Sequence, residues 1–475
     1  MELHVRLSGR GDLAGQIYQQ VRTMILDGRL TPRQPLPPSR ELAKQLAVSR
    51  NTVAVAYDRL SAEGYVVGRA GAGTYVNAAL PAAPAPEARA GVPLRPRDPW
   101  DRLQPPDDLS APDACWDLRA GMPDPRLFPY QTWRRLTADE LRAAAVGSGA
   151  YGDPAGHPAL RAALARHVGV SRGVLAGPDD VLVTSGLQQV ADLVARVLLA
   201  PGDVVAVEDP GYPPPMMLFR ALGARVARVP VDREGLVVDA LPDETRLVYV
   251  TPSHQFPLGV AMSLPRRLAL LAWARQRDAV LLEDDYDCEF RYAGRPLEPL
   301  HALDRDGRVV YASSLSKLLL PTLRLGFCVP PPALRSALRA AKFVADWHTA
   351  LPTQAALARF VADGGLARHL RRTRSVYRQR YDLIGRWLAG PADRWLEPVP
   401  SAAGLHVSAL LRSGSAEDAA AIADRARGRG VLLAPLDRPA FGGRAGLVLG
   451  YGLVPTDRLP AGLAELTKAL AETGS

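Results

Sequence analysis

Lysine is almost absent from this chain. Only four of the 58 Lys and Arg residues are lysines, at Lys44, Lys317, Lys342 and Lys468, which leaves 54 arginines. A chain rich in Arg, Ala, Gly and Pro is typical of a GC-rich genome, in which lysine codons drift to arginine codons wherever chemistry permits. Arginine cannot lose its proton in a protein, whereas lysine can become a neutral amine nucleophile. Each remaining lysine is therefore a candidate for a role that arginine cannot fill.

Cysteine and long apolar runs are also scarce. The three cysteines, Cys115, Cys288 and Cys328, lie far apart and form no CxxC pair, so we expect neither a disulfide framework nor a metal site. No stretch approaches about 18 uninterrupted apolar residues. The N-terminus lacks the apolar segment of a signal peptide. We therefore expect no membrane span and a cytoplasmic protein.

The size and charge of the chain say little about its fold class or its binding partners. Its 475 residues, 47% of them hydrophobic and 23% charged, predict a globular protein of two or more units. A net charge of +9 over this length is a weak sign of a polyanionic partner. The motifs must therefore decide the function.

A Pro/Ala-rich segment at residues 78–115 divides the chain. It has no periodic apolar pattern, so we expect a semi-rigid linker there. The linker separates a head of residues 1–77 from a body of residues 116–475. Within the body we expect a large subdomain over about residues 150–335 and a small one over about residues 336–475.

Hydrophobic spacing predicts three short helices in the head. The first ends at Asp27-Gly28, and the second and third begin at Ser39 and Ser49, each of which suits an N-cap. Two short capped helices joined by a tight turn are a helix-turn-helix signature. A hairpin within residues 65–76 would follow as a wing.

The outward-facing residues of this helix pair suit DNA. Arg50, Asn51 and Thr52 occupy the first turn of the third helix, where a recognition helix meets base edges. The remaining cations, on the second helix and at the wing base, are placed to touch phosphates. They are Arg40, Lys44 and Arg69.

Residues 1–77 resemble the GntR family of bacterial repressors over their whole length. The resemblance implies that Arg40, Arg50 and Thr52 contact double-stranded DNA and that Gly73 belongs to a wing in the minor groove. We add Ser49, the N-cap of the recognition helix, to this set. The motifs that carry the resemblance are LPPSRELA (36–43), VSRNTV (48–53), AYDRLxAEGY (56–65) and GxGTYV (71–76).

In the body, short apolar runs alternate with helical stretches. Such runs are typical of strands buried on both faces of a mostly parallel sheet, so we expect an α/β fold. In these sheets ligands bind beyond the carboxyl ends of the strands. The runs are residues 181–183, 204–207, 247–250, 280–282 and 309–311.

Three polar clusters follow these strands, and each is a weak signal alone. Residues 184–189 open a helix whose N-terminus suits a phosphate. Tyr212, in the loop of residues 208–212, could stack on a planar cofactor, and His254, within residues 251–259, could reach a ring hydroxyl. Taken one at a time, an ordinary turn, a core tyrosine and a structural histidine are the commoner explanations.

Two further clusters are more specific. Residues 283–287 place carboxylates at the end of an apolar strand, an arrangement that requires a cation such as a protonated pyridine nitrogen. Residues 313–317 follow the next strand, with Arg324 seven positions after Lys317. Hydroxyls and a guanidinium suit a phosphate, and a lysine of lowered pKa can form a Schiff base. Lys317 is therefore the first candidate for covalent chemistry.

Residues 116–475 resemble the aminotransferases of fold type I, which bind pyridoxal 5′-phosphate (PLP), and the S-x-S-K and P-x-x-R-x-G motifs are matched between Ser314 and Gly326. The resemblance implies that Lys317 holds the internal aldimine. It further implies that Asp284 pairs with the pyridine nitrogen, and that Tyr286 bonds the ring hydroxyl. The other implied cofactor-binding residues are Tyr212 on the ring, His254 near its hydroxyl, and Gly186, Leu187, Gln188, Ser314 and Arg324 on the phosphate.

The body departs from that family at two positions. Phe256 stands where the family usually has an asparagine below the ring, so His254 or Gln255 would substitute for it. Val448 stands where the family usually has an arginine that clamps a substrate carboxylate. Arg444 is the nearby candidate for an effector contact. An efficient general transaminase is therefore disfavoured.

A GntR head, a linker and an aminotransferase-like body together resemble the MocR subfamily of GntR regulators, of which the segment from Glu283 to Tyr292 is characteristic. The resemblance implies a homodimeric, PLP-dependent transcription factor without physiological turnover, although a weak transaminase half-reaction is conceivable. Its small-molecule effector would be PLP itself or an amino compound such as 4-aminobutyrate or taurine, sensed at Lys317. The alternatives are an aminotransferase with a residual head and a body that only dimerises.

Overall fold

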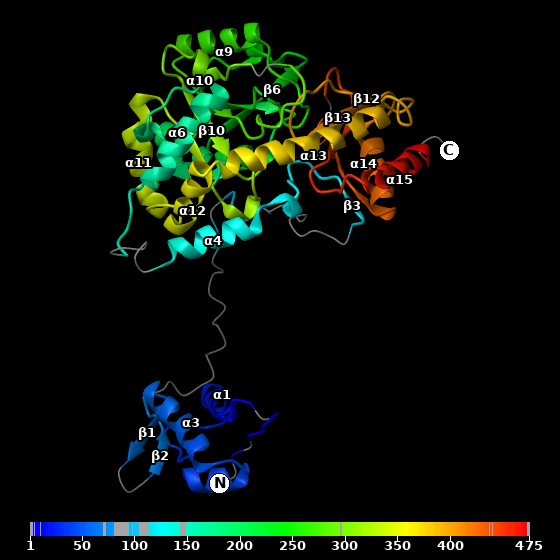
Figure 1. Cartoon of the computed structure of the whole chain (residues 1–475). Coiled ribbons are helices and arrows are strands. Elements are labelled where there is room, and N and C mark those ends of the chain that lie inside the picture. Colours follow the sequence, from blue (N-terminus) through cyan, green and yellow to red (C-terminus); the bar gives the residue numbers. More distant parts are fainter. Residues whose placement is uncertain are drawn as a thin grey trace. The chain divides into compact units, whose positions relative to one another are not determined.

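A computed structural model of the chain forms two compact units, Met1–Pro96 and Arg97–Ser475 (Figure 1). Most of the expected linker lies outside the residues that the structure describes. These are residues 3, 5–9, 11–69, 73–79, 95–96, 98–103, 114–142, 149–294, 297–436, 438 and 440–472.

The head contains the three expected helices and the expected hairpin. Its core is built from apolar residues of all three helices, among them Ile17, Leu42 and Leu60, each fully buried. The two strands of the hairpin pair antiparallel, with Val66 opposite Val76. The elements are α1 (Leu13–Leu26), α2 (Ser39–Gln45), α3 (Arg50–Ala62), β1 (Val66–Arg69) and β2 (Gly73–Val76).

One of the two expected N-caps is confirmed and the other is wrong. The Ser49 hydroxyl accepts a hydrogen bond from the backbone N–H of Thr52 and caps α3. Ser39 instead lies inside α2, whose N-cap position is held by Pro38 without a side-chain bond. Proline fixes φ near the helical value and needs no donor, so the helix begins directly after it.

The body is built on an eight-stranded, mostly parallel sheet in the order β4-β11-β10-β9-β8-β5-β6-β7. All five expected strands are present. Two strands that the sequence analysis did not predict, β11 and β7, run antiparallel to their neighbours. The strands are β4 (Leu182–Thr184), β5 (Val204–Asp209), β6 (Arg225–Asp232), β7 (Gly235–Leu236), β8 (Thr245–Val250), β9 (Val280–Asp284), β10 (Val309–Ser314) and β11 (Gly326–Val329).

Helices cover both faces of this sheet, because successive residues of each strand point to opposite sides. On β8, Leu247 and Tyr249 join a cluster with residues of α7 and α8, whereas Val248 and Val250 join a cluster with residues of α9. The helices of this part are α4 (Tyr130–Glu140), α6 (Pro158–Arg172), α7 (Leu187–Leu198), α8 (Pro213–Ala221), α9 (Leu264–Gln276) and α10 (Leu300–Leu303).

A smaller four-stranded sheet, in the order β12-β13-β16-β15, forms the second part of the body. The long helix α13 leads into it, whereas α11 and α12, expected in the small subdomain, pack against α7, α4 and α6 of the large one. A short parallel pair, β3 with β14, ties the start of the body to its C-terminal part. These elements are β3 (Trp116–Asp117), α11 (Pro332–Asp346), α12 (Leu351–Ala362), α13 (Gly365–Leu388), β12 (Leu396–Pro398), β13 (His406–Leu411), α14 (Ala416–Gly428), β14 (Val431–Leu432), β15 (Ala434–Pro435), β16 (Gly446–Gly450) and α15 (Leu459–Ala471).

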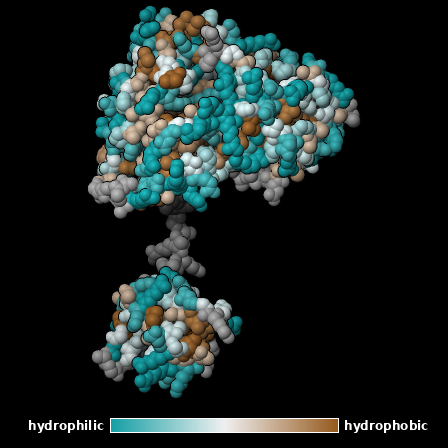
Figure 2. All heavy atoms as spheres, in the orientation of Figure 1, coloured by the Kyte–Doolittle hydropathy of each residue, from teal (hydrophilic) through white to brown (hydrophobic). Residues whose placement is uncertain are grey.

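The surface of each unit is largely hydrophilic on the face shown in Figure 2, with hydrophobic residues in small scattered groups. Within the described ranges, none of the helices combines the length and the hydropathy needed to cross a bilayer.

Candidate functional site

Three cations on the second and third helices of the head lie on its surface, outside its described ion pairs. Arg40 and Lys44 of α2 and Arg50 at the start of α3 are exposed, and no described side chain pairs with them. Asn51 is exposed beside Arg50. Unpaired guanidinium and ammonium groups at the N-terminus of one short helix and along its neighbour are suited to phosphates and base edges.

The other head residues are more constrained. The Thr52 hydroxyl is 2.8 Å from the Ser49 hydroxyl, so both side chains are engaged in the cap of α3. The Arg69 guanidinium lies over the Tyr75 ring at 5.0 Å from its centroid, which holds the end of β1 against β2. Gly73 begins β2 with φ of 105°, a conformation that favours glycine.

In the body, the strand β9 ends in consecutive carboxylates that point to alternate sides of the sheet. Glu283 accepts hydrogen bonds from the backbone N–H groups of Leu300 and His301. Burial raises the pKa of Glu283 to about 7. The carboxylate is thus held by backbone donors on the α10 side of the sheet.

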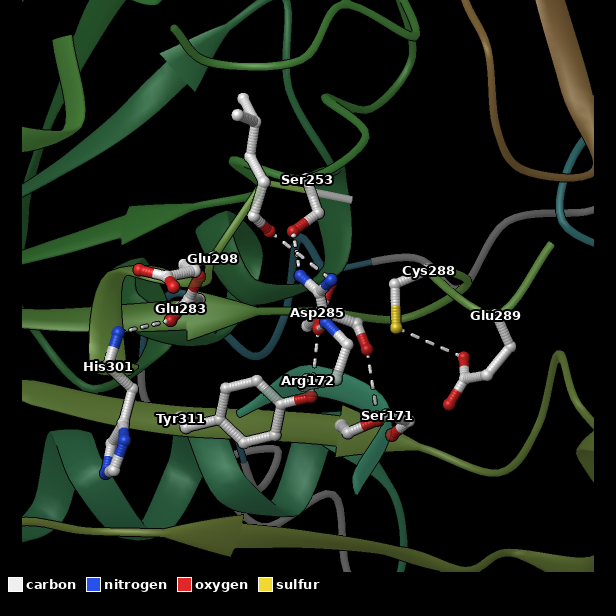
Figure 3. Close-up of polar contacts among 12 residues, drawn as sticks. Ser171, Arg172, Ser253, Glu283, Asp285, Cys288, Glu289, Glu298, His301 and Tyr311 are labelled. Carbon is white, nitrogen blue, oxygen red and sulfur yellow. Dashed lines mark hydrogen bonds and ion pairs between the residues drawn. The ribbon is translucent and has the colours of Figure 1, made fainter. Parts of the chain in front are cut away.

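Asp285, on the same side as Glu283, belongs to a buried ion pair (Figure 3). The Arg172 Nε lies 2.7 Å from Asp285 Oδ2, and the Tyr311 hydroxyl donates to the same oxygen at 2.9 Å. Arg172 also donates to the Ser253 hydroxyl at 2.8 Å. Despite its burial the pKa of Asp285 is lowered, because Arg172 stabilises the charged form.

Asp284 points to the opposite side. Its Oδ2 accepts from the Tyr249 hydroxyl at 2.7 Å, whereas its buried Oδ1 has no partner among the described residues. Burial raises the pKa of Asp284 to about 8. A buried carboxyl with one free oxygen is suited to a cationic or hydrogen-bond-donating ligand.

Lys317 lies on the Asp284 side, in the segment that follows β10. It is partly buried, and loss of hydration lowers the pKa of its ammonium group, with Asp287 and Asp284 acting in the opposite direction. Gly121 lies beside it, because a Cβ at that position would stand 2.9 Å from Lys317 Nζ. The amine therefore lies close enough to two carboxylates to interact with them, and a side chain at residue 121 would press against it.

The N-terminus of α7 lies next to Arg324. Gly186 precedes the helix with φ of 95°, and Leu187 and Gln188 begin it. Backbone N–H groups of a first helical turn have no acceptor within the helix, so they suit an anion. A Cβ at Gly186 would stand 3.1 Å from an Arg324 nitrogen, and Arg324 donates to the Ser185 carbonyl oxygen at 2.6 Å.

Arg324 itself has φ of 50° and ψ of 51°, the left-handed conformation that few residues other than glycine adopt. Two neighbouring side chains of the expected phosphate set are engaged elsewhere. The Ser314 hydroxyl accepts from the backbone N–H of Ser316, and the Gln188 amide donates to the Pro214 carbonyl oxygen. Gln188 would therefore contribute its backbone rather than its side chain.

The expected ring contacts, Tyr212, Tyr286 and His254, lie around the same space. Tyr212 packs edge-on against Phe256, with ring centroids 5.3 Å apart. The Tyr286 hydroxyl donates to the His254 carbonyl oxygen at 2.9 Å and lies 3.1 Å from His254 Nδ1. His254 Nδ1 is also 3.0 Å from Asp287 Oδ2, so a buried Asp-His-Tyr chain borders the site.

Comparison with known proteins agrees with both halves of this description. Residues 13–76 match the model of bacterial regulatory proteins of the gntR family, and residues 119–436 match that of class I and II aminotransferases. The chain is 36% identical over 468 residues to the probable rhizopine catabolism regulatory protein MocR of Rhizobium meliloti, covering 96% of this chain and 93% of that protein. It is 33% identical to the pyridoxine biosynthesis transcriptional regulator PdxR of Corynebacterium glutamicum, covering 96% and 95%.

The chain belongs to the MocR subfamily of GntR transcriptional regulators. Its body also superposes on the kynurenine aminotransferase of Pyrococcus horikoshii with a TM-score of 0.69 and 29% identity, covering 77% of this chain and 92% of that one. The expected fold class, a winged helix-turn-helix head with an α/β aminotransferase body of fold type I, is thereby confirmed.

In this MocR-type body, the position of the usual carboxylate clamp is apolar. Val448 is buried in a cluster with Leu258, Val399 and other aliphatic residues between the two sheets. Arg444, four residues earlier, is already paired, with its Nη1 2.9 Å from Glu397 Oε2 and its Nη2 donating to the Leu411 carbonyl oxygen. The structure therefore gives Arg444 a structural partner and no free guanidinium for an effector.

Several residues of this MocR-type site were absent from the sequence-based candidates. Tyr249 lies within a strand that appeared purely apolar, and Gly121 precedes Lys317 by almost 200 positions. Asp287 stands in the acidic segment, but its link to His254 depends on two loops meeting. Only Asp287 had a local signal, its place in the carboxylate cluster.

Proposed function

We propose that this protein is a transcriptional regulator that binds double-stranded DNA through its head and PLP through its body. Its place in the MocR subfamily supports the first part. One observation carries the second: the Lys317 amine lies close enough to Asp284 to interact with it electrostatically, and the buried Oδ1 of Asp284 has no described partner.

The residues present fit the parts of PLP. Asp284 would hold a protonated pyridine nitrogen, and the Lys317 amine would attach to the aldehyde. The N-terminus of α7, with Arg324 beside it, would hold the phosphate. When bound, the cofactor supplies an electron sink for reactions at an amino group. The Tyr286 hydroxyl, whose proton goes to the His254 carbonyl oxygen, would accept a hydrogen bond from the ring hydroxyl, and Tyr212 would cover the ring face.

The effector would be either PLP or an amino compound. Val448 in the clamp position and the paired Arg444 favour PLP, because neither residue offers a free guanidinium to a substrate carboxylate. We further propose a cytoplasmic homodimer, whose two heads would contact two half-sites of one operator.

The cofactor assignment is tested by absorption spectroscopy of the purified protein. We expect a near-visible band that borohydride abolishes and that Lys317→Ala removes. Lys468→Ala is the matched control, because this lysine is exposed on α15 and should leave the band unchanged. A wild-type protein that shows no such band after incubation with PLP contradicts the assignment.

The regulator assignment is tested against the aminotransferase alternative. Selection from random-sequence duplexes, followed by gel shift, should yield an operator that the full chain binds. Sustained transfer of an amino group between an amino acid and a 2-oxo acid, without enrichment of any duplex, would favour the enzyme instead.

A further inference from the structure

A cavity of about 500 Å³ lies between the large and small parts of the body. Ser253, Gly259, Ala261 and Arg291 line it from the large part. The remaining walls come from the end of α13 and from the segment that carries β12 and the start of β13. A volume of this size lies within the range of small-molecule sites, which is about 300–1,000 Å³.

This cavity is separate from the proposed cofactor site. Of the described residues that line it, none belongs to the set formed by Lys317, Asp284, Tyr286 and Arg324. The loop of residues 251–259 separates the two, since Ser253 and Gly259 face the cavity while His254 bonds to Asp287 and Tyr286.

The walls are mostly apolar, and their hydroxyl groups are already engaged. Ser253 accepts from Arg172, and Tyr381 donates to the Ser401 carbonyl oxygen at 2.6 Å. The larger apolar lining residues are Leu388, Pro398, Val399, Pro400 and Val407. A ligand would therefore bury an apolar body here.

Arg291 is the exception in this lining. No described carboxylate pairs with its guanidinium, and its buried Nε has no hydrogen-bond partner in the described chain. The neighbouring arginines are satisfied, since Arg172 is paired with Asp285, and Arg267 lies 3.9 Å from Glu283 and donates to backbone carbonyl oxygens. The Arg291 cation at the cavity wall thus has no counter-charge among the described residues, and burial together with the Arg172 charge lowers its pKa.

We propose that this cavity binds a small organic monocarboxylate with an apolar body, whose carboxylate pairs with Arg291. A planar guanidinium matches a carboxylate with two parallel hydrogen bonds. A single guanidinium among mostly apolar walls suits a monoanion better than a phosphate dianion, which would keep one of its two charges unpaired. The ligand would touch both parts of the body and one side of the loop that carries His254.

Titration calorimetry on the full-length protein, with benzoate as the probe, tests the proposal. Benzoate should bind at one site per chain, benzyl alcohol should bind about tenfold or more weakly because it lacks the charge, and inorganic phosphate should not bind. Arg291→Gln should weaken benzoate binding by a similar factor. Arg427→Gln, at an exposed and unpaired position on α14, should not.

A second variant tests the cavity without touching the charge. A Cβ at Gly385, on α13 at the cavity wall, meets no atom within 4 Å, so Gly385→Phe should fold and fill the space. Gly428→Phe is the matched control, since Gly428 on α14 is equally open. Gly385→Phe should abolish benzoate binding, and Gly428→Phe should leave it unchanged.

The proposal is overturned if benzoate fails to bind the wild type, if phosphate binds in its place, or if binding survives both Arg291→Gln and Gly385→Phe. Loss of benzoate binding in Lys317→Ala, with retention in Arg291→Gln, would place the ligand in the cofactor site and overturn it as well. Because the readout is benzoate binding, its failure leaves the absorption and gel-shift results unaffected.

Discussion

Asp284 and Asp285 are adjacent in sequence, yet we predict that neutralising them changes the stability of the cofactor-free protein in opposite directions. Asp284→Asn should stabilise it at pH 7, and Asp285→Asn should destabilise it. The reason is their placement on opposite sides of β9: burial dominates at Asp284, whereas Arg172 compensates burial at Asp285.

The size of each effect follows from the pKa shifts. The pKa of Asp284 rises from 3.8 to about 8, so its contribution to stability is complete below about pH 4 and is lost as the pH rises toward 8. Ionisation of Asp284 therefore lowers the free energy of unfolding, relative to its value at low pH, by about 4 kcal/mol at pH 7 and by about 1.6 kcal/mol at pH 5. The pKa of Asp285 is lowered, so its contribution is present above pH 3.8. Removing that charge leaves Arg172 buried and unpaired, at a cost of about 3–5 kcal/mol.

Urea unfolding of the cofactor-free variants, followed by tryptophan fluorescence at pH 5 and pH 7, measures both effects. Asn at position 284 can still accept from Tyr249, so the variant should keep that bond. Asp239→Asn, at an exposed position, is the control and should be neutral. The reasoning is refuted if both substitutions move the urea midpoint the same way, or if the gain from Asp284→Asn does not grow between pH 5 and pH 7.

Three further predictions concern other parts of the molecule. Burial raises the pKa of Glu208 from 4.5 to about 7, so the charged carboxylate makes the free energy of unfolding fall as the pH rises through this range. Glu208→Gln should make that fall about 3 kcal/mol smaller, and a fall of unchanged size in urea unfolding would contradict this. Gly121→Val places a side chain against Lys317 Nζ at a residue with φ of 75°; the near-visible band should disappear while DNA binding in gel shifts persists, and a variant with full cofactor content would disprove the contact. In the head, Arg50→Ala should weaken the free energy of DNA binding by about 1–3 kcal/mol and relax specificity at one base pair. Lys44→Ala should instead lower the slope of log K against log salt concentration by about one. Identical effects of the two substitutions on specificity and on salt slope would show that the residues do not divide base and phosphate contacts in this way.

The fold was predictable wherever burial was uniform along an element. The five strands that were recognised each contain a run of at least three apolar residues. Strand β6 (Arg225–Asp232) was missed because its residues are only partly buried and include charged side chains. Strand β11 (Gly326–Val329) was missed because it follows the Lys317 motif closely and runs antiparallel, against the βαβ pattern. Serine favours the N-cap position, but α2 has Pro38 there because the fixed φ of proline suits the start of a helix, so Ser39 is the first helical residue.

The site residues that directly follow a strand of the sheet could be predicted from the sequence. Parallel strands place their carboxyl ends at one edge of the sheet, so Asp284 and Lys317 were expected to converge, and the two groups do interact electrostatically. Local sequence carries no signal for Gly121 beside Lys317 or for the unpaired Arg291. The positions of Gly121 and Arg291 depend on segments far apart in the sequence, which come together only when the two parts of the body fold.

At Arg324, the backbone conformation lowers the stability of the fold, while the side chain is proposed to bind the cofactor phosphate. A non-glycine residue in this conformation costs free energy, of the order of 1 kcal/mol, that glycine would not. Arg324→Gly is therefore expected to relax the backbone while removing the guanidinium beside the start of α7. A laboratory selection for heat resistance alone would favour that replacement, and the survivors would be sturdier proteins without the group proposed to hold the phosphate. An arginine in so unfavourable a conformation is therefore better explained by ligand binding than by stability.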